Sequence, residues 1–89
     1  MYQIIRETER QGSIVIPEYC SYFWLVLNGE RKLINSFPKY DVSNVEGEIE
    51  LFHSEDEFEV YDYIKDNMPY FAVVVRDLFI RFRTGDETW

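Results

Sequence analysis

The sequence contains one cysteine, one histidine, four glycines and three prolines, and it has no long apolar run. A single thiol, Cys20, cannot form an internal disulfide bond. No membrane-spanning helix is expected, because that would need ~18 consecutive apolar residues. The first residues, MYQIIRETERQG, lack the apolar segment of a secretory signal, so we expect a cytoplasmic protein. Because 89 residues hold one hydrophobic core, a single domain (1–89) is predicted.

The scarcity of histidine and cysteine also argues against an enzyme or a zinc site. Zinc needs several such ligands, and a nucleophile needs a base with an orienting partner. Cys20 is more typical of a small core residue, and His53 of a residue just before a helix cap. The calcium loop D-x-D-x-D-G is absent, although SEDE and EGEIE leave weak calcium binding open. We expect no catalytic residue, no metal and no cofactor.

Several segments have the composition and alternation of β-strands. The dipeptide Asn28-Gly29 between two β-rich runs predicts a hairpin with strands at about 21–27 and 30–36. The first residues fit a short helix or a strand, and we favour a strand followed by a second one at SIVIP, which Pro17 ends. PKYDVSN is expected to be a loop.

Two later segments complete the predicted sheet. VEGEIELF alternates, which predicts a half-buried strand with Val45, Gly47, Ile49 and Leu51 on the inner face. YFAVVVRDLFIRFRT (70–84) is rich in β-branched and aromatic residues and predicts one long strand or two short ones. Arg76, Arg81 and Arg83 would then form a charged edge.

One helix is predicted at about 54–67. Ser54 and Glu57 have the spacing of a capping box, and Pro69 ends the helix. The buried stripe of this helix is expected to consist of Val60, Tyr61, Ile64 and Met68. The predicted fold class is therefore α+β: a small antiparallel sheet with one main helix packed on it.

Acidic residues are concentrated in one segment. The chain has 17 acidic and 9 basic residues, and its net charge is −8. Residues 41–66 contain ten acids and one base, a charge of −9, so the rest of the chain carries +1. Such a segment repels nucleic acids and membrane surfaces and attracts basic surfaces. We expect neither direct nucleic-acid binding nor membrane binding.

The acids of this segment fall into two regular rows. Glu55, Glu59, Asp62 and Asp66 share one side of the predicted helix over about 16 Å. Each pair of neighbouring like charges costs roughly 0.2–0.5 kcal/mol. Glu46, Glu48 and Glu50 project from one face of the predicted strand at ~6.6 Å intervals. The rows fit a solvated acidic surface, or they fit a mimic of the DNA phosphate backbone. One protomer is sparser in charge than B-DNA, and a dimer would lengthen the rows.

In size, acidity and mixed α/β character, the chain resembles the phage-encoded DNA-mimic inhibitors, of which the anti-restriction nuclease proteins of T-even phages are the nearest in character. The resemblance lies in overall size and charge pattern and includes no diagnostic motif. It implies binding to a DNA-binding host protein with a basic cleft, often as a dimer, in the host cytoplasm. The expected partner-binding residues, taken from the spacing argument, are Glu46, Glu48, Glu50, Glu55, Glu59, Asp62 and Asp66. The alternative is an acidic adaptor or immunity-type protein without mimicry, which would bind through Phe23, Trp24 or Tyr70.

Overall fold

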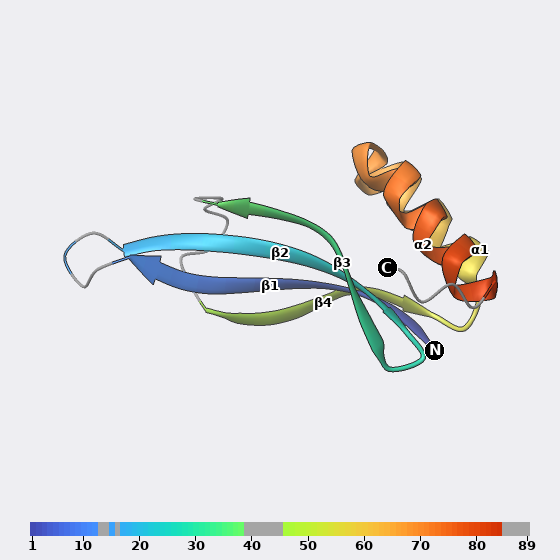
Figure 1. Cartoon of the computed structure of the whole chain (residues 1–89), viewed down its shortest axis with the longest axis horizontal. Coiled ribbons are helices and arrows are strands. Elements are labelled where there is room, and N and C mark those ends of the chain that lie inside the picture. Colours follow the sequence, from blue (N-terminus) through green and yellow to red (C-terminus); the bar gives the residue numbers. More distant parts are fainter. Residues whose placement is uncertain (13–14, 16, 39–45, 85–89) are drawn as a thin grey trace.

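The protein forms a four-stranded antiparallel sheet with two helices at one end (Figure 1). This computed structural model describes residues 1–12, 15, 17–38 and 46–84. The strand order is β3-β2-β1-β4. The elements are β1 (Tyr2–Gly12), β2 (Pro17–Leu27), β3 (Glu30–Pro38), β4 (Gly47–Ser54), α1 (Glu57–Asn67), a 3-10 turn η1 (Pro69–Phe71) and α2 (Ala72–Thr84). The predicted α+β class is confirmed.

The predicted hairpin at Asn28-Gly29 is present between β2 and β3. Asn28 has φ 51° and Gly29 has φ 91°, the positive values that a two-residue hairpin turn requires. Asn and Gly are the residues that adopt this conformation most easily. The local sequence therefore determines this part of the sheet.

The N-terminal segment is a strand, as favoured. β1 pairs with β2 along its whole length, from Tyr2↔Leu27 to Gly12↔Pro17. Pro17 thus begins β2 and does not end a strand, which corrects the prediction for SIVIP. Most of that segment lies outside the described residues, as do PKYDVSN beyond Pro38 and the tail GDETW.

The segment 70–84 was predicted as strand and is helical. Pro69 opens the turn η1, where its fixed φ and missing N–H are tolerated, and α2 follows directly. Val75 and Phe79 are buried at helical spacing, with Leu78 and Phe82 half-buried beside them. Tertiary packing thus overrides the strand propensity of the valine run. No helix in the described ranges is long and apolar enough to cross a membrane.

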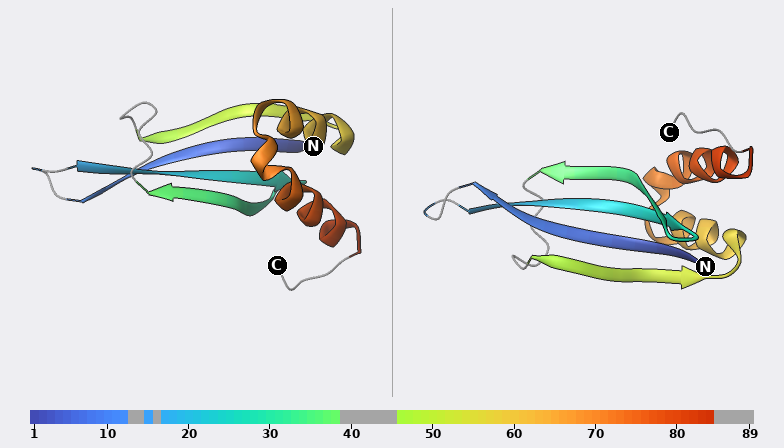
Figure 2. Two further views of the ribbon diagram at one scale, coloured as in Figure 1. Left: turned by 90° about the horizontal axis from the view of Figure 1, so that it is seen from above. Right: turned by 60° about the horizontal axis from the view of Figure 1, so that its bottom comes forward.

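Both helices pack on the same face of the sheet, over the end that contains the start of β1 (Figure 2). Val60 and Ile64 are fully buried and Met68 nearly so, as the predicted stripe requires, whereas Tyr61 is only half-buried. Aromatic contacts join the layers. The ring pairs are Tyr2–Phe79, Phe23–Phe71 and Phe52–Tyr63, the last stacked with centroids 4.6 Å apart.

Strand β4 contains a β-bulge that breaks its predicted alternation. Ile5 pairs with Glu50 and Ile4 with Phe52, so Leu51 is an extra residue. Leu51 and Phe52 are half-buried against the core, but Ile49 is 48% exposed. Ile49 and Gly47 pair with Arg6 and Thr8 and so lie on the same face as Ile4, as predicted, but both are exposed, so the predicted burial holds at Leu51 and fails at Ile49 and Gly47. Val45 lies outside the described residues.

Candidate functional site: the carboxylates of β4 and α1

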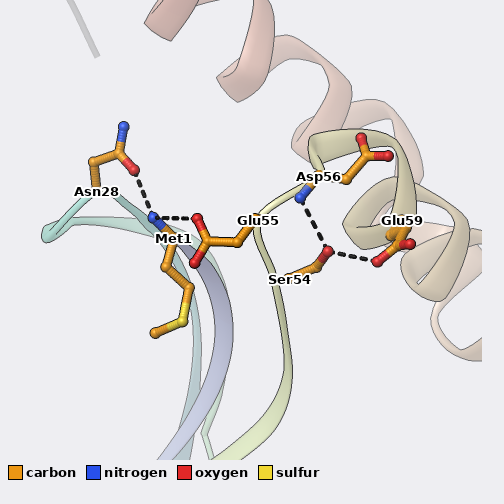
Figure 3. A network of polar contacts seen from close by, with 6 residues as sticks. All are labelled: Met1, Asn28, Ser54, Glu55, Asp56 and Glu59. Carbon is orange, nitrogen blue, oxygen red and sulfur yellow. Dashed lines mark hydrogen bonds and ion pairs between the residues drawn. The ribbon is translucent and has the colours of Figure 1, made fainter.

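The N-terminus of α1 begins two residues later than predicted. Ser54 is the last residue of β4 and pairs with Tyr2. The N-cap is Asp56, whose Oδ1 accepts a hydrogen bond of 2.9 Å from the Phe58 N–H. Ser54 Oγ accepts a bond from the Asp56 N–H and donates one to Glu59 (Figure 3). The capping box assigned to Ser54 and Glu57 is therefore wrong, because the N-cap is Asp56. Asp56 and Glu59 have the same spacing as Ser54 and Glu57, so the sequence allowed both assignments.

This later start removes Glu55 from the helical row. Glu55 lies between β4 and α1 with its side chain 82% exposed. Its carboxylate is 3.5 Å from the amino nitrogen of Met1, which also donates a 2.8 Å hydrogen bond to Asn28 Oδ1 (Figure 3). Glu55 thus contacts the chain's own cationic group.

The remaining helical carboxylates form a row on the solvent side of α1. We call Glu59, Asp62 and Asp66 the acidic ridge; their spacing is i, i+3, i+7, about 10 Å along the axis. All three are exposed, and they point away from the buried side of the helix. Asp62 and Asp66 make no hydrogen bond or ion pair in the described part of the chain, and Glu59 contacts Ser54 alone. The basic residue of this helix, Lys65, lies over the ring of Tyr61.

The carboxylates of β4 point to the opposite side of the molecule. Glu50 pairs with Ile5 and Glu48 with Glu7 in the antiparallel register, and paired residues share a face. Ile4, the neighbour of Ile5, belongs to the core beneath the helices, and successive strand residues point to opposite faces. Ile5, Glu48 and Glu50 therefore lie on the other face of the sheet, away from α1 and α2, which we call the helix-free face. Glu46 is exposed just before β4.

Glu48 takes part in a salt bridge across the helix-free face. The Arg31 guanidinium on β3 donates two hydrogen bonds to the Glu48 carboxylate, although β3 and β4 are opposite edges of the sheet. Arg31 also lies over the ring of Trp24, whose Nε1 donates to Glu7. We call this Arg31–Glu48 contact the sheet clasp. These hydrogen bonds lower the pKa of the Glu48 carboxyl group and raise the pKa of the Arg31 guanidinium.

Glu50 also has partners within the chain. Gln3 Nε2 donates a 2.6 Å hydrogen bond to one carboxylate oxygen, and His53 Nδ1 lies 2.6 Å from the other. The hydrogen bond from Gln3 is the largest cause that lowers the pKa of Glu50, and the contact with His53 is the next. The ionised carboxylate is therefore stabilised by groups of the helix-free face.

The two rows of carboxylates do not form one continuous surface, which corrects the geometric expectation from the sequence. The acidic ridge faces solvent from the helical layer, and the strand acids face solvent from the other side of the sheet. Strand alternation, shifted by the bulge at Leu51, determines this separation. Of the seven residues predicted to bind a partner, three share one face without contacting any arginine or lysine: Glu59, Asp62 and Asp66.

The isolated chemical groups of the sequence stay apart. Cys20 is buried and free, as expected for a core residue. His53 lies within β4 opposite Gln3, not just before the helix cap, and Cys20 lies opposite Glu9. Six strand residues separate these positions, about 20 Å, so no Cys–His pair forms. Within the described residues, no three histidine, cysteine or acidic side chains could hold a metal ion.

A cavity of about 340 Å³ lies between α1 and α2, and sequence reasoning missed it because α2 was predicted as strand. Glu57 and Arg83 form an ion pair of 2.8 Å in its wall. The exposed aromatic residue Phe58 lies at its rim. The complete lining is Glu57, Phe58, Tyr61, Arg76, Phe79 and Arg83. The three arginines of the C-terminal segment are therefore helical residues, and two of them border this cavity.

Comparison with known proteins gives no relative: no protein-family model, no curated protein and no solved structure matches the chain.

Proposed function

We propose that the protein binds the basic DNA-binding surface of another protein through the acidic ridge, and that it acts there as a charge mimic of DNA. The observation that carries this proposal is the uncompensated state of the ridge. Asp62 and Asp66 are exposed, repeat at helical spacing and contact no basic side chain among the described residues. A partner that neutralises them would relieve a repulsion that the free protein tolerates.

The ridge carries a lower charge density than one DNA strand, which counts against mimicry of a long duplex by one protomer, and the proposal is limited to a short stretch of one strand. Three carboxylates over about 10 Å give one charge per ~5 Å, whereas one strand of B-DNA carries a charge every 3.4 Å and the duplex one every 1.7 Å. Electrostatic steering would speed the association, and added salt would weaken the complex. Glu46, Glu48, Glu50 and Glu55 contribute only to the long-range negative potential in this proposal.

The test compares two variants that lose the same charge from opposite sides of the molecule. The ridge variant carries Glu59→Gln, Asp62→Asn and Asp66→Asn, and the control variant carries Glu46→Gln, Glu48→Gln and Glu50→Gln. Each variant and the parent protein are immobilised and exposed to a bacterial lysate, with and without competing duplex DNA.

Charge mimicry predicts that the parent and the control variant capture DNA-binding proteins, that duplex DNA displaces them, and that the ridge variant loses them. The captured protein is then purified, and its complex is titrated against salt. An equal loss of capture in both variants would show that net charge alone governs binding. Capture that duplex DNA leaves unchanged would refute DNA mimicry.

The second candidate is an interaction module without mimicry, and the exposed apolar residues of the helical layer favour it. Tyr70 and Val73 are 69% and 79% exposed, and Ile80 is also exposed. Phe23 and Trp24, proposed from the sequence for this role, are buried and half-buried, so Tyr70 is the one of the three proposed residues that is exposed to a partner. A Tyr70→Ser, Val73→Ser variant would lose the partner here, whereas the ridge variant would retain it. A homodimer through this surface stays a prediction that sedimentation velocity measures.

A further inference from the structure

The cavity between α1 and α2 has the composition of a binding site for a small apolar anion. Its lining includes Phe79, which is buried in the core, and the aromatic residues Phe58 and Tyr61 of α1. Phe58 is 67% exposed, so its ring is accessible to a ligand that enters the cavity. The volume of about 340 Å³ lies within the ~300–1,000 Å³ common for small-molecule sites.

The charges of the lining leave one positive charge without a counterion. Glu57 carries −1, and Arg76 and Arg83 carry +1 each, so the lining sums to +1. Arg83 is paired with Glu57 at 2.8 Å, and the Glu57 side chain is only 19% exposed. Arg76 is exposed and makes no ion pair within the described residues. The net charge of −8 opposes anions in general, but the unpaired guanidinium of Arg76 locally favours one negative group.

We propose that this cavity binds a small aromatic carboxylate, with its ring between Phe58, Tyr61 and Phe79 and its carboxylate on Arg76. Aromatic rings in contact prefer offset or edge-to-face arrangements, which a wall of three rings provides. A guanidinium binds a carboxylate with two parallel hydrogen bonds. An acidic macromolecule is disfavoured, because it would bring its negative surface against the acidic ridge on the same helix.

The experiment uses the full ¹⁵N-labelled chain and two probes of the same shape, 2-naphthoate and its neutral amide, naphthalene-2-carboxamide. Amide shifts in α1 and α2 report binding, and amides of β1–β4 report that the fold is unchanged. We expect saturable shifts around the cavity, with the carboxylate bound about five- to tenfold more tightly than the amide.

Three variants locate the site. Arg76→Gln should abolish the preference for the carboxylate. Arg81→Gln, a matched change in a residue of α2 that pairs with Asp77 and lies outside the lining, should keep it. Phe58→Ala should weaken both probes equally, and the substitution is at an exposed site, so the fold is retained.

Absence of saturable shifts at millimolar probe, equal affinity for the two probes, or an unchanged preference in Arg76→Gln would each overturn the proposal. The ridge variant described above should bind 2-naphthoate at least as well as the parent protein. Loss of partner capture and loss of probe binding therefore report on different surfaces.

Discussion

The charges of the acidic ridge should have opposite effects on stability at the two ends of α1. The perturbation is neutralisation of one residue at a time by Glu59→Gln, Asp62→Asn or Asp66→Asn. Each change keeps the shape of the side chain, and Asp and Asn have similar helix propensity. The three variants therefore differ mainly in where along the helix a negative charge is removed.

The largest gain in the free energy of unfolding is expected for Asp66→Asn. Asp66 lies in the last turn of α1, where a negative charge faces the negative end of the helix dipole, at a cost of about 0.3–1 kcal/mol. Its repulsion with Asp62 at i−4 adds roughly 0.2–0.5 kcal/mol. The variant should therefore be more stable than the parent by about 0.5–1.5 kcal/mol, the sum of those two ranges.

Asp62→Asn and Glu59→Gln should differ in sign. Asp62 has two like-charged neighbours, and its attraction to Lys65 at i+3 offsets one of them, so its neutralisation should stabilise by roughly 0.2–0.5 kcal/mol. Glu59 lies in the first turn, near the positive end of the dipole, and accepts the hydrogen bond from Ser54. Its neutralisation should destabilise the protein, because these two contributions exceed the relief of one repulsion.

Urea unfolding at pH 7 measures these differences, once at low salt and once at 0.5 M NaCl. A change of 1 kcal/mol corresponds to about 4–8 °C in Tm for a domain of this size. Salt should shrink all three differences, because the charges are exposed. A destabilised Asp66→Asn, a stabilised Glu59→Gln, or differences that salt leaves unchanged would refute the reasoning.

Four further changes test the other contacts. Asp56→Ala should cost about 1 kcal/mol as loss of an N-cap, measured by urea unfolding; a neutral result would contradict the cap assignment. In a double-mutant cycle, Arg31→Gln and Glu48→Gln should each destabilise, and the double variant should cost less than their sum; additivity would refute the sheet clasp. Glu48 and Glu50 have lowered pKa values in the folded protein, so their stabilisation is present above the unfolded value near 4.3 and is lost as the pH falls through the folded pKa. Glu50→Gln should therefore flatten the loss of stability below about pH 4.5 in acid unfolding followed by circular dichroism, and an unchanged acid limb would exclude this contribution. Gly29→Ala should destabilise by about 1–2 kcal/mol, because alanine is strained at φ 91°; a thermal melt equal to that of the parent would contradict it.

Local signals in the sequence predicted the hairpin and the buried stripe of the first helix. The hairpin at Asn28-Gly29 follows from the conformational preferences of two residues, and the buried stripe Val60, Ile64 and Met68 follows from helical periodicity. Both signals act within a few residues, so they need no knowledge of the rest of the fold. The α+β class follows from combining them.

The errors arise where tertiary contacts decide between two local possibilities. The valine run 73–75 has strand propensity, but Val75 and Phe79 bury one side of a helix against the sheet. The segment SEDEFE (54–59) contains two frames with capping-box spacing, and the pairing of Ser54 with Tyr2 selects the later one. Neither choice is visible in a window of ten residues.

The candidate site was predicted only in part, because its geometry depends on which face of the sheet each strand residue occupies. The bulge at Leu51 and the pairing with β1 place Glu48 and Glu50 on the face of the sheet away from the helices. Alternation alone does not tell which face the helices cover. The spacing of the acidic ridge was predictable for Glu59, Asp62 and Asp66, which lie within the helix in either capping frame.

The acidic residues behind the net charge of −8 fall into two groups that differ in their contacts within the chain. No helix of the described chain packs on the far face of the sheet, where Ile5 and Val26 are buried among strand side chains. There Glu48 is paired with Arg31, so its charge joins the two edges of the sheet and serves stability. Asp62 and Asp66 have no such partner among the described residues. Their mutual repulsion is unfavourable, and the helix dipole disfavours the negative charge of Asp66. Contacts within the chain therefore account for Glu48 and Glu50 on the sheet face, whereas no contact among the described residues accounts for Asp62 and Asp66, and partner binding is our proposal for them.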